Sequence, residues 1–169
     1  MWSPPYRAEM DQFRSERCTE KVEDRMNLLK IARSPAITVS PEDSVMSAVE
    51  KMTDNEVGAV AVIENDKLRG IFTERDLMTR VVRKHLSCLE TRVGEVMTPD
   101  PEVAPVEMDA SEAFEYMTER HFRHMPIVDE NGTLLGMLSV RHLMLKIVEV
   151  MAHELEGLNS YICADGIGG

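Results

Sequence analysis

The fold is decided by the stretch GIFTERD, residues 70–76. The apolar run from Leu68 to Phe72 predicts a short buried strand, and Thr73 predicts the start of an amphipathic helix. The apolar positions of that helix share one face, at Leu77, Met78, Val81 and Val82. Gly70 has no Cβ, so we expect another backbone or a ligand to approach the strand closely there.

A second copy of this pattern lies 66 residues further on, where residues 136–142 read GMLSVRH and lead into another helix. Around both copies the same elements recur in the same order: an extended segment, a helix, a strand, a short turn and a return strand. The second turn, Asn131-Gly132, is typical of a two-residue hairpin. The strands and turns follow an offset of 66 and the helices before them an offset of 65, which predicts one inserted residue between helix and strand. The chain is therefore predicted to be an internal duplication.

Four segments follow from this duplication. Residues 1–25 form a polar, mixed-charge extension, residues 26–88 the first repeat and residues 89–150 the second repeat. Residues 151–169 form the end of the last helix and a glycine-rich tail. The last helix carries a stripe that favours packing on the body or on a partner subunit over cofactor binding. The stripe consists of Val140, Leu143, Met144, Ile147, Val148, Met151 and Leu155.

Composition limits the function classes. The 169 residues suffice for one compact domain or two small ones. A net charge of −11 repels nucleic acid and anionic membranes, so we expect neither as a partner. The three cysteines lie far apart and match no metal or redox spacing, which fits a reducing compartment. With no apolar run of about 20 residues and no signal-peptide pattern, we expect a cytoplasmic protein.

Taken in order, these motifs resemble the CBS domain pair, which is named after cystathionine β-synthase and is also called a Bateman module. The resemblance covers residues 28–150 and rests on GIFTERD (70–76), VMTPDP (96–101) and MTERHFRHMPIVD (117–129). It implies an α+β fold of two β-α-β-β-α repeats packed sheet to sheet around a pseudo-twofold axis. The N-terminal extension and the extended C-terminal helix would lie outside this pair. It also implies a homodimer and two symmetric clefts, in which family members bind AMP, ADP, ATP, NAD or S-adenosylmethionine.

The first predicted site consists of Thr73, Arg75 and Asp76. A threonine at a helix start places its hydroxyl and free backbone N–H groups where an anion is favoured. The carboxylate one turn later can accept from both hydroxyls of a ribose, each bond contributing ~1.5–3 kcal/mol. Thr73 and Asp76 also fit a capping box that only stabilises the helix, by about 1 kcal/mol. Both interpretations stay open, and the repeat context favours ribose binding.

The second repeat departs from this pattern at Ser139, Arg141 and His142. The serine keeps the cap hydroxyl, but a histidine cannot accept from two ribose hydroxyls at once. We therefore expect one good adenosine site and a weak or empty second cleft. A zinc site at His121 and His124 is not predicted, because no third ligand lies near them in sequence.

The other site residues come from the resemblance. It implies phosphate contacts from a cationic stretch, for which solvated surface residues are the alternative: Arg120, His121, Arg123 and His124. It implies adenine contacts from apolar strand edges and the neighbouring backbone: Ile37, Val39, Val57, Gly58 and Ala59.

The sequence contains no nucleophile–base–acid set, no P-loop and no metal cluster, so we do not expect an enzyme. The predicted function is a regulatory module that binds AMP, ADP or ATP, or else NAD or S-adenosylmethionine, and signals to an unidentified partner protein. The alternative is an interaction scaffold with vestigial clefts, which an intact Thr73, Arg75 and Asp76 set argues against. On the ribose interpretation, Asp76→Ala abolishes ligand binding and leaves the fold intact.

Overall fold

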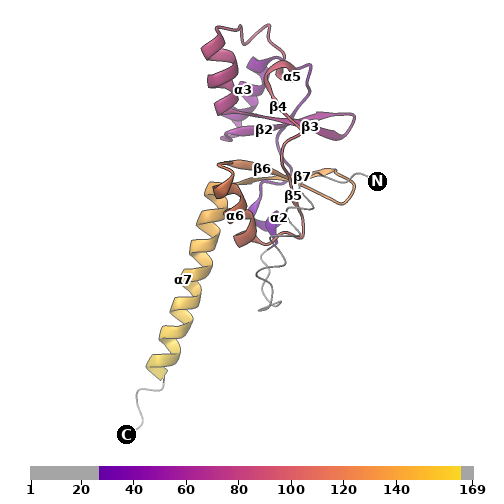
Figure 1. The fold of residues 1–169 in the computed structure, drawn as a ribbon. Coiled ribbons are helices and arrows are strands. Elements are labelled where there is room, and N and C mark those ends of the chain that lie inside the picture. The colour runs from indigo at the N-terminus through magenta and orange to yellow at the C-terminus, as the bar shows by residue number, and fades with distance from the viewer. Residues whose placement is uncertain (1–26, 165–169) are drawn as a thin grey trace.

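The computed structural model describes residues 27–164, which form two stacked α/β units and a long helix leaving the second unit (Figure 1). The predicted extension over residues 1–25 and the tail after residue 164 lie outside these residues. The first unit contains β1 (Thr38–Val39), α3 (Val45–Asp54), β2 (Ala59–Glu64), β3 (Lys67–Thr73), α4 (Glu74–Asp76), the π-helix η1 (Leu77–Val81) and the 3₁₀-helix η2 (Val82–Lys84). The second contains β5 (Ala104–Pro105), α6 (Ala110–Glu119), β6 (His124–Val128), β7 (Leu134–Ser139) and α7 (Val140–Ala164). Two opening segments precede the units, α2 (Leu28–Ile31) and α5 (Val93–Val96) with β4 (Thr98–Pro99).

Each unit is built on a hairpin. In the first sheet, of order β1-β2-β3-β4, β2 and β3 are antiparallel, β1 runs parallel to β2 and β4 runs antiparallel to β3. The second sheet repeats this plan in the order β5-β6-β7, and a bridge between Arg33 and Met137 takes the place of β4. The predicted strands on both sides of the two turns are confirmed, because their apolar runs are buried on both faces of the sheets.

The two opening segments are exchanged between the units. Val93 and Val96 of α5 lie in the hydrophobic core of the first unit, among Val45, Val60 and Phe72. Leu28 of α2 lies fully buried in the core of the second unit. Figure 1 shows α2 in indigo beside α6 of the second unit, although α2 comes first in the chain. Each unit is therefore completed by the segment that precedes the other.

The two sheets pack face to face. A third apolar cluster joins them, formed by Ala59, Ala61 and Ile71 of the first sheet and Met137 of the second. Ile71 and Met137 stand at the same position of the two repeats, immediately after Gly70 and Gly136. This arrangement confirms the predicted α+β architecture of two repeats packed sheet to sheet.

The offset between the repeats changes at a different place from the one predicted. Thr73 lies opposite Ala59 in the first hairpin, whereas Ser139 lies opposite His124 in the second. β2 and β6 are therefore related by 65 residues, and the extra residue lies in the turn between β6 and β7. The predicted insertion before β6 is wrong, because a strand that is apolar on both faces gives no sequence sign of a one-residue shift.

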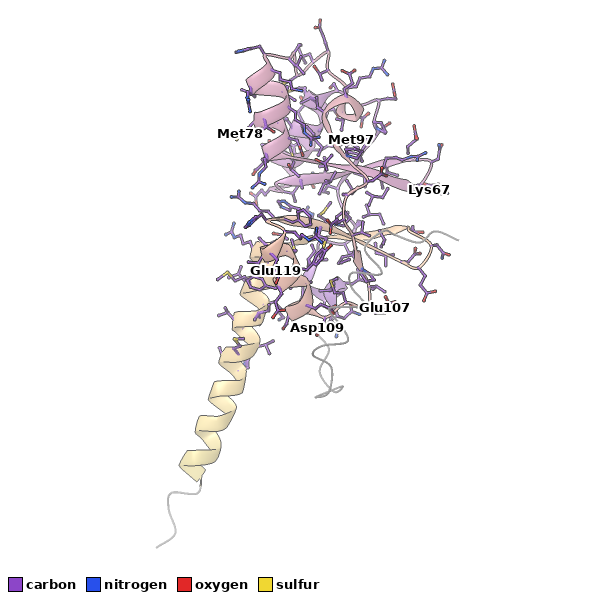
Figure 2. All side chains as sticks on the ribbon, in the orientation of Figure 1. Lys67, Met78, Met97, Glu107, Asp109 and Glu119 are labelled. Atoms are coloured by element: carbon purple, nitrogen blue, oxygen red, sulfur yellow. The ribbon has the colours of Figure 1, made fainter. Side chains whose placement is uncertain are left out.

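The helical segment after Thr73 does not keep the predicted apolar face. Val81 is fully buried and Leu77 packs on the core, but Met78 is 67% exposed and Val82 58% exposed. The core of the first unit contacts only the side of this segment that carries Leu77 and Val81. Met78 accordingly lies at the outer surface of the first unit (Figure 2).

The stripe of α7 also divides. Leu143 is buried, and Val140 and Ile147 pack on the second core, whereas Met144 and Val148 are more than half exposed. Leu155 lies beyond the part of α7 whose side chains the structure describes. Within residues 27–164, no helix combines the length and the apolar character that a bilayer span requires.

Candidate functional site

The first candidate site lies where β3 turns into α4. Thr73 has extended backbone angles, φ −126° and ψ 163°, so its hydroxyl accepts from the backbone N–H of Asp76 at 3.2 Å. Oδ2 of Asp76 accepts in return from the backbone N–H of Thr73 at 3.0 Å and from its hydroxyl at 2.7 Å. The capping box that the sequence allowed is therefore present.

The second oxygen of Asp76 is held by side chains from elsewhere. Oδ1 accepts from the hydroxyl of Thr98 at 3.2 Å and lies 3.3 Å from Nε of Arg80. The guanidinium of Arg80 also donates to the carbonyl groups of Val96 and Met97. Asp76 is only 6% exposed. We therefore expect Asp76→Ala to lower the stability of the fold as well as any ligand binding, because the change removes a helix cap and leaves Arg80 without its carboxylate.

A side chain that the sequence analysis missed, Glu74, reaches the junction between the repeats. A Cβ on Gly58 would stand 3.2 Å from Oε2 of Glu74 and 3.0 Å from Cε1 of His124. The absence of that Cβ is what lets the carboxylate and the imidazole approach each other across the two repeats. The signal in the sequence was Gly58 itself, immediately before β2, where a close approach needs a residue without a side chain.

His124 is a half-buried imidazole at this junction. Burial lowers the pKa of His124 below its ordinary value of 6.5, and the carboxylate of Glu74 opposes this effect. The positive charge of Arg123 and the imidazole of His142 lower the pKa of His124 further. Residues from the motifs of both repeats, Glu74 and His142, thus act on one imidazole.

The four predicted phosphate contacts separate into two places. Arg123 and His124 lie at the start of β6, beside the junction. Arg120 lies at the end of α6, where its Nη1 is 3.8 Å from Oε1 of Glu102 and its guanidinium stands 5.6 Å from the centre of the Tyr116 ring. His121 follows it with a left-handed backbone, φ 59°. The structure therefore brings two of these four side chains, Arg123 and His124, toward the motif.

The predicted adenine contacts differ in their exposure. Val39 is 3% exposed in the first core, and Ala59 is 3% exposed between the two sheets. Both side chains are covered within the fold, and the contact predicted at Ala59 is with its backbone rather than its side chain. Ile37 and Val57 are half-buried against the first core, and Gly58 is half-buried at the junction.

The motif of the second repeat stands beside an open cavity. Ser139 is half-buried, and Arg141 and His142 are exposed on the first turn of α7. A cavity of about 420 Å³ is lined by α2, Arg33 and α7, with His142 at its wall. Another, of about 560 Å³, lies beside α5 and β4, and Arg69 and Arg92 are among the residues around it. Neither cavity has Thr73 or Asp76 in its wall. Among residues 27–164, no group of three or more His, Cys, Asp or Glu side chains is placed to hold a metal ion.

Comparison with known proteins gives consistent matches. A family model described as the CBS domain matches residues 28–83 and 93–149. The CBS domain-containing protein CBSX3, mitochondrial, of Arabidopsis thaliana is 31% identical over 163 residues, which cover 94% of this chain and 77% of that protein. Other curated relatives are much longer, and the match spans 20% and 18% of two of them.

Solved structures agree with this match. A protein with CBS domains from Burkholderia ambifaria MC40-6 superimposes with a TM-score of 0.68 and 31% identity, over 73% of this chain and 95% of that one. The Arabidopsis thaliana protein CBSX2, in complex with AMP, gives a TM-score of 0.63 at 24% identity, over 74% and 98% of the two chains. The match to CBSX2 shows a shared fold.

Proposed function

This chain belongs to the CBS domain family, and from that membership we propose that it is a non-catalytic regulator that binds an adenosine-containing ligand beside Thr73 and Asp76. AMP, ADP and ATP are the first candidates, and NAD and S-adenosylmethionine follow. The complex of CBSX2 with AMP, a protein of the same fold, supports this choice. The ligand would change the orientation of the two repeats relative to each other, and an unidentified partner protein would recognise this change.

The observation that carries the proposal is that Asp76 accepts from two hydroxyl groups, those of Thr73 and Thr98. A ribose presents the same chemistry, two neighbouring hydroxyls, so its binding would exchange the bond from Thr98 for one from the ligand. Arg75, exposed on the first turn of α4, and Arg123 and His124, at the junction, are the proposed phosphate contacts. The proposed adenine contacts are Ile37, Val39 and Val57 with the backbone of Gly58 and Ala59, and the more accessible Ile37, Val57 and Gly58 are the first to test.

The test is a thermal-shift screen of the full chain against AMP, ADP, ATP, NAD, NADH and S-adenosylmethionine. A ligand at about 100 times its dissociation constant adds about 2.7 kcal/mol to the free energy of unfolding. Arg123→Gln should reduce the ligand-induced shift, and Arg83→Gln, which changes an arginine on η2 that is also exposed, should not. Asp76→Asn also weakens the helix start and so lowers the unfolding midpoint by itself. For this variant, the midpoint with ligand is therefore compared with the midpoint of the same variant without ligand.

A protein that responds to none of the six ligands would contradict the proposal. That result would favour the alternative, an interaction scaffold whose clefts are vestigial. An equal loss of the shift in Arg123→Gln and Arg83→Gln would instead show binding elsewhere on the surface, and would remove Arg123 and His124 from the site.

We further propose that the chain forms a homodimer through an apolar face that recurs in both repeats. Met78 and Met144 stand at the same position of the two repeats and are 67% and 56% exposed. Val82 and Val148, one turn later, are 58% and 54% exposed. An exposed apolar face repeated with the pseudo-symmetry of the fold fits a symmetric partner better than isolated surface contacts do.

A cytoplasmic location is proposed from the cysteines, of which Cys88, within the described residues, is a free thiol. The relative CBSX3 is described as mitochondrial, so location can differ among similar chains. Imaging of the full chain fused to a fluorescent protein at its C-terminus tests the proposal, and a mitochondrial signal would contradict it.

A further inference from the structure

The last helix of the second repeat is much longer than its counterpart in the first. In the first repeat the helical segment ends at Lys84, and His85 leaves it with a left-handed backbone, φ 55°. The counterpart of His85, 66 residues later, is Met151, which lies within α7 and is 57% exposed. From there α7 continues to Ala164. The duplicated fold therefore gives no structural role to the last part of α7.

This part of α7 leaves the body of the protein. Ile147 is the last residue of α7 that packs on the core of the second unit, within the residues whose side chains the structure describes. Figure 1 shows α7 running on in yellow, with no other labelled helix or strand beside its end. A helix in water gains most of its stability from packing an apolar face, so residues 148–164 need a surface to cover them.

The apolar residues of this part follow a seven-residue repeat. Their spacing alternates between four and three residues in a row that we call the α7 row: Met144, Val148, Met151, Leu155, Leu158 and Ile162. The first three side chains are 56%, 54% and 57% exposed. Although the chain has a net charge of −11, the three glutamates between residues 148 and 164 all stand outside this row. A sustained alternation of three and four is the pattern of a coiled coil.

The residue types of the α7 row favour a second copy of the same helix as the partner. Val148 and Ile162 are β-branched and stand at one core position of the repeat, and methionine or leucine stands at the other. This distribution favours two parallel strands. In a parallel pair, the position of Glu154 in one helix neighbours that of Asn159 in the other, so acids do not face each other there.

The direction of pairing rests on the homodimer proposed above, whose apolar face includes Met144 and Val148, the first two residues of the α7 row. A head-to-tail dimer would place this end of α7 against the first repeat, which ends at His85 and would leave the row uncovered from Met151 onward. A head-to-head dimer places the two α7 helices side by side, and the apolar face then continues along both. We propose that residues 148–164 of two copies form a parallel two-stranded coiled coil, the stem, which sets the dimer head to head.

The direction is tested on the full chain by electron paramagnetic resonance. The variant Cys18→Ser/Cys88→Ser keeps Cys163 as its single thiol, and a nitroxide spin label is attached there. The stem places the two labels within about 30 Å of each other, because each helix is only about 10–12 Å wide. A head-to-tail dimer places them at opposite ends of the assembly, beyond this distance.

The contact itself is tested by sedimentation equilibrium. Met151→Glu/Leu155→Glu should raise the dissociation constant of the dimer at least about tenfold, because it buries two carboxylates per chain in an apolar contact. The matched control is His153→Glu/Ser160→Glu. It adds the same two charges on the same helix, seven residues apart and outside the α7 row. This control should change the dissociation constant less than about threefold.

A natural chain that is monomeric at micromolar concentration would overturn the proposal, as would equal weakening by the two double variants. A dimer whose labels lie far apart would overturn the stem and leave the proposed homodimer face standing. A dimer with close labels that persists in Val82→Glu would support the stem and remove Val82 from that face, so the two proposals fail separately. Neither measurement depends on an adenosine ligand.

Discussion

The hydroxyl of Thr98 donates to Oδ1 of Asp76 at 3.2 Å, and this bond joins the opening segment of the second repeat to the helix start of the first. Asp76 is 6% exposed and its other oxygen is occupied by Thr73. The bond between Thr98 and Asp76 therefore attaches β4 to a buried carboxylate. A substitution that removes this bond weakens the attachment of the exchanged segment without changing a residue of either core.

Thr98→Val should lower the free energy of unfolding by about 1.5–3 kcal/mol, because it removes a hydrogen bond to a charged, buried acceptor. The measurement is urea denaturation followed by circular dichroism. Thr53→Val is the matched control, since the hydroxyl of Thr53 only donates to the carbonyl of Val49 on the exposed side of α3. A control effect within about 0.5 kcal/mol is expected. Equal effects of the two changes would show that Asp76 does not depend on Thr98.

Gly70→Ala should destabilise the protein by about 1–3 kcal/mol, because a core site without room forces its neighbours to shift. A Cβ on Gly70 would stand 2.5 Å from Sδ of Met97 and 2.8 Å from the carbonyl oxygen of Thr98, and the second contact is with backbone. Gly136→Ala is the internal control, since its shortest contact is 3.1 Å, to the carbonyl oxygen of Arg33. The midpoint of thermal unfolding should be clearly lower for Gly70→Ala than for Gly136→Ala. The reverse order would contradict the packing described at β4.

Acid should destabilise the protein through His124. The pKa of His124 is lowered in the folded state, so between this value and 6.5 the unfolded chain binds more protons, and stability falls as the pH falls below about 6.5. One such group changes the free energy of unfolding by at most about 1.4 kcal/mol per pH unit. Denaturation at pH 7.5, 6.5 and 5.5 should show a shallower dependence for His124→Gln than for the natural sequence.

Glu74→Gln refines this test. The carboxylate of Glu74 raises the pKa of His124, so its removal should lower that pKa further and extend the loss of stability to more acidic pH. Arg123 and His142 also act on His124 and stay unchanged in this variant. Identical pH profiles for the natural sequence, His124→Gln and Glu74→Gln would argue against a buried, neutral His124.

Val82→Glu combined with Val148→Glu should convert the proposed homodimer into monomers, because two carboxylates per chain would be buried in an apolar interface. Light scattering after size-exclusion chromatography gives the mass directly. Lys67→Glu, at the tip of the first hairpin and far from Met78 in Figure 2, should leave the dimer intact. A natural protein that is already monomeric at micromolar concentration would refute the proposed interface.

Much of the fold was predictable because the strands are short apolar runs bounded by turn residues. The two hairpins and the helix starts at Ser44 and Asp109 follow local chemistry, a side-chain oxygen accepting from the first turn. The exchange of α2 and α5 was not predictable in this way. Leu28 and Val93 fill equivalent places in two similar cores, and nothing in either segment says which core it enters.

The site was predictable only where it depends on neighbours in sequence. Thr73 and Asp76 stand three residues apart, so the capping box could be weighed in advance. The bond from Thr98 and the approach of Glu74 to His124 join residues far apart in the chain, and the pairing of sheets decides both. The cavity beside His142 depends on Arg33, which reaches it through the same exchange.

The exchanged opening segments also set the order in which the protein can fold as it is made. The first core lacks Val93 and Val96 until α5 has left the ribosome, and Leu28 has no core to enter until β6 and α7 follow. The first half therefore cannot finish before the second has begun, unlike chains whose domains fold one by one during synthesis. The two halves should unfold in a single cooperative step, and a chain cut between them should yield neither half as a stable product.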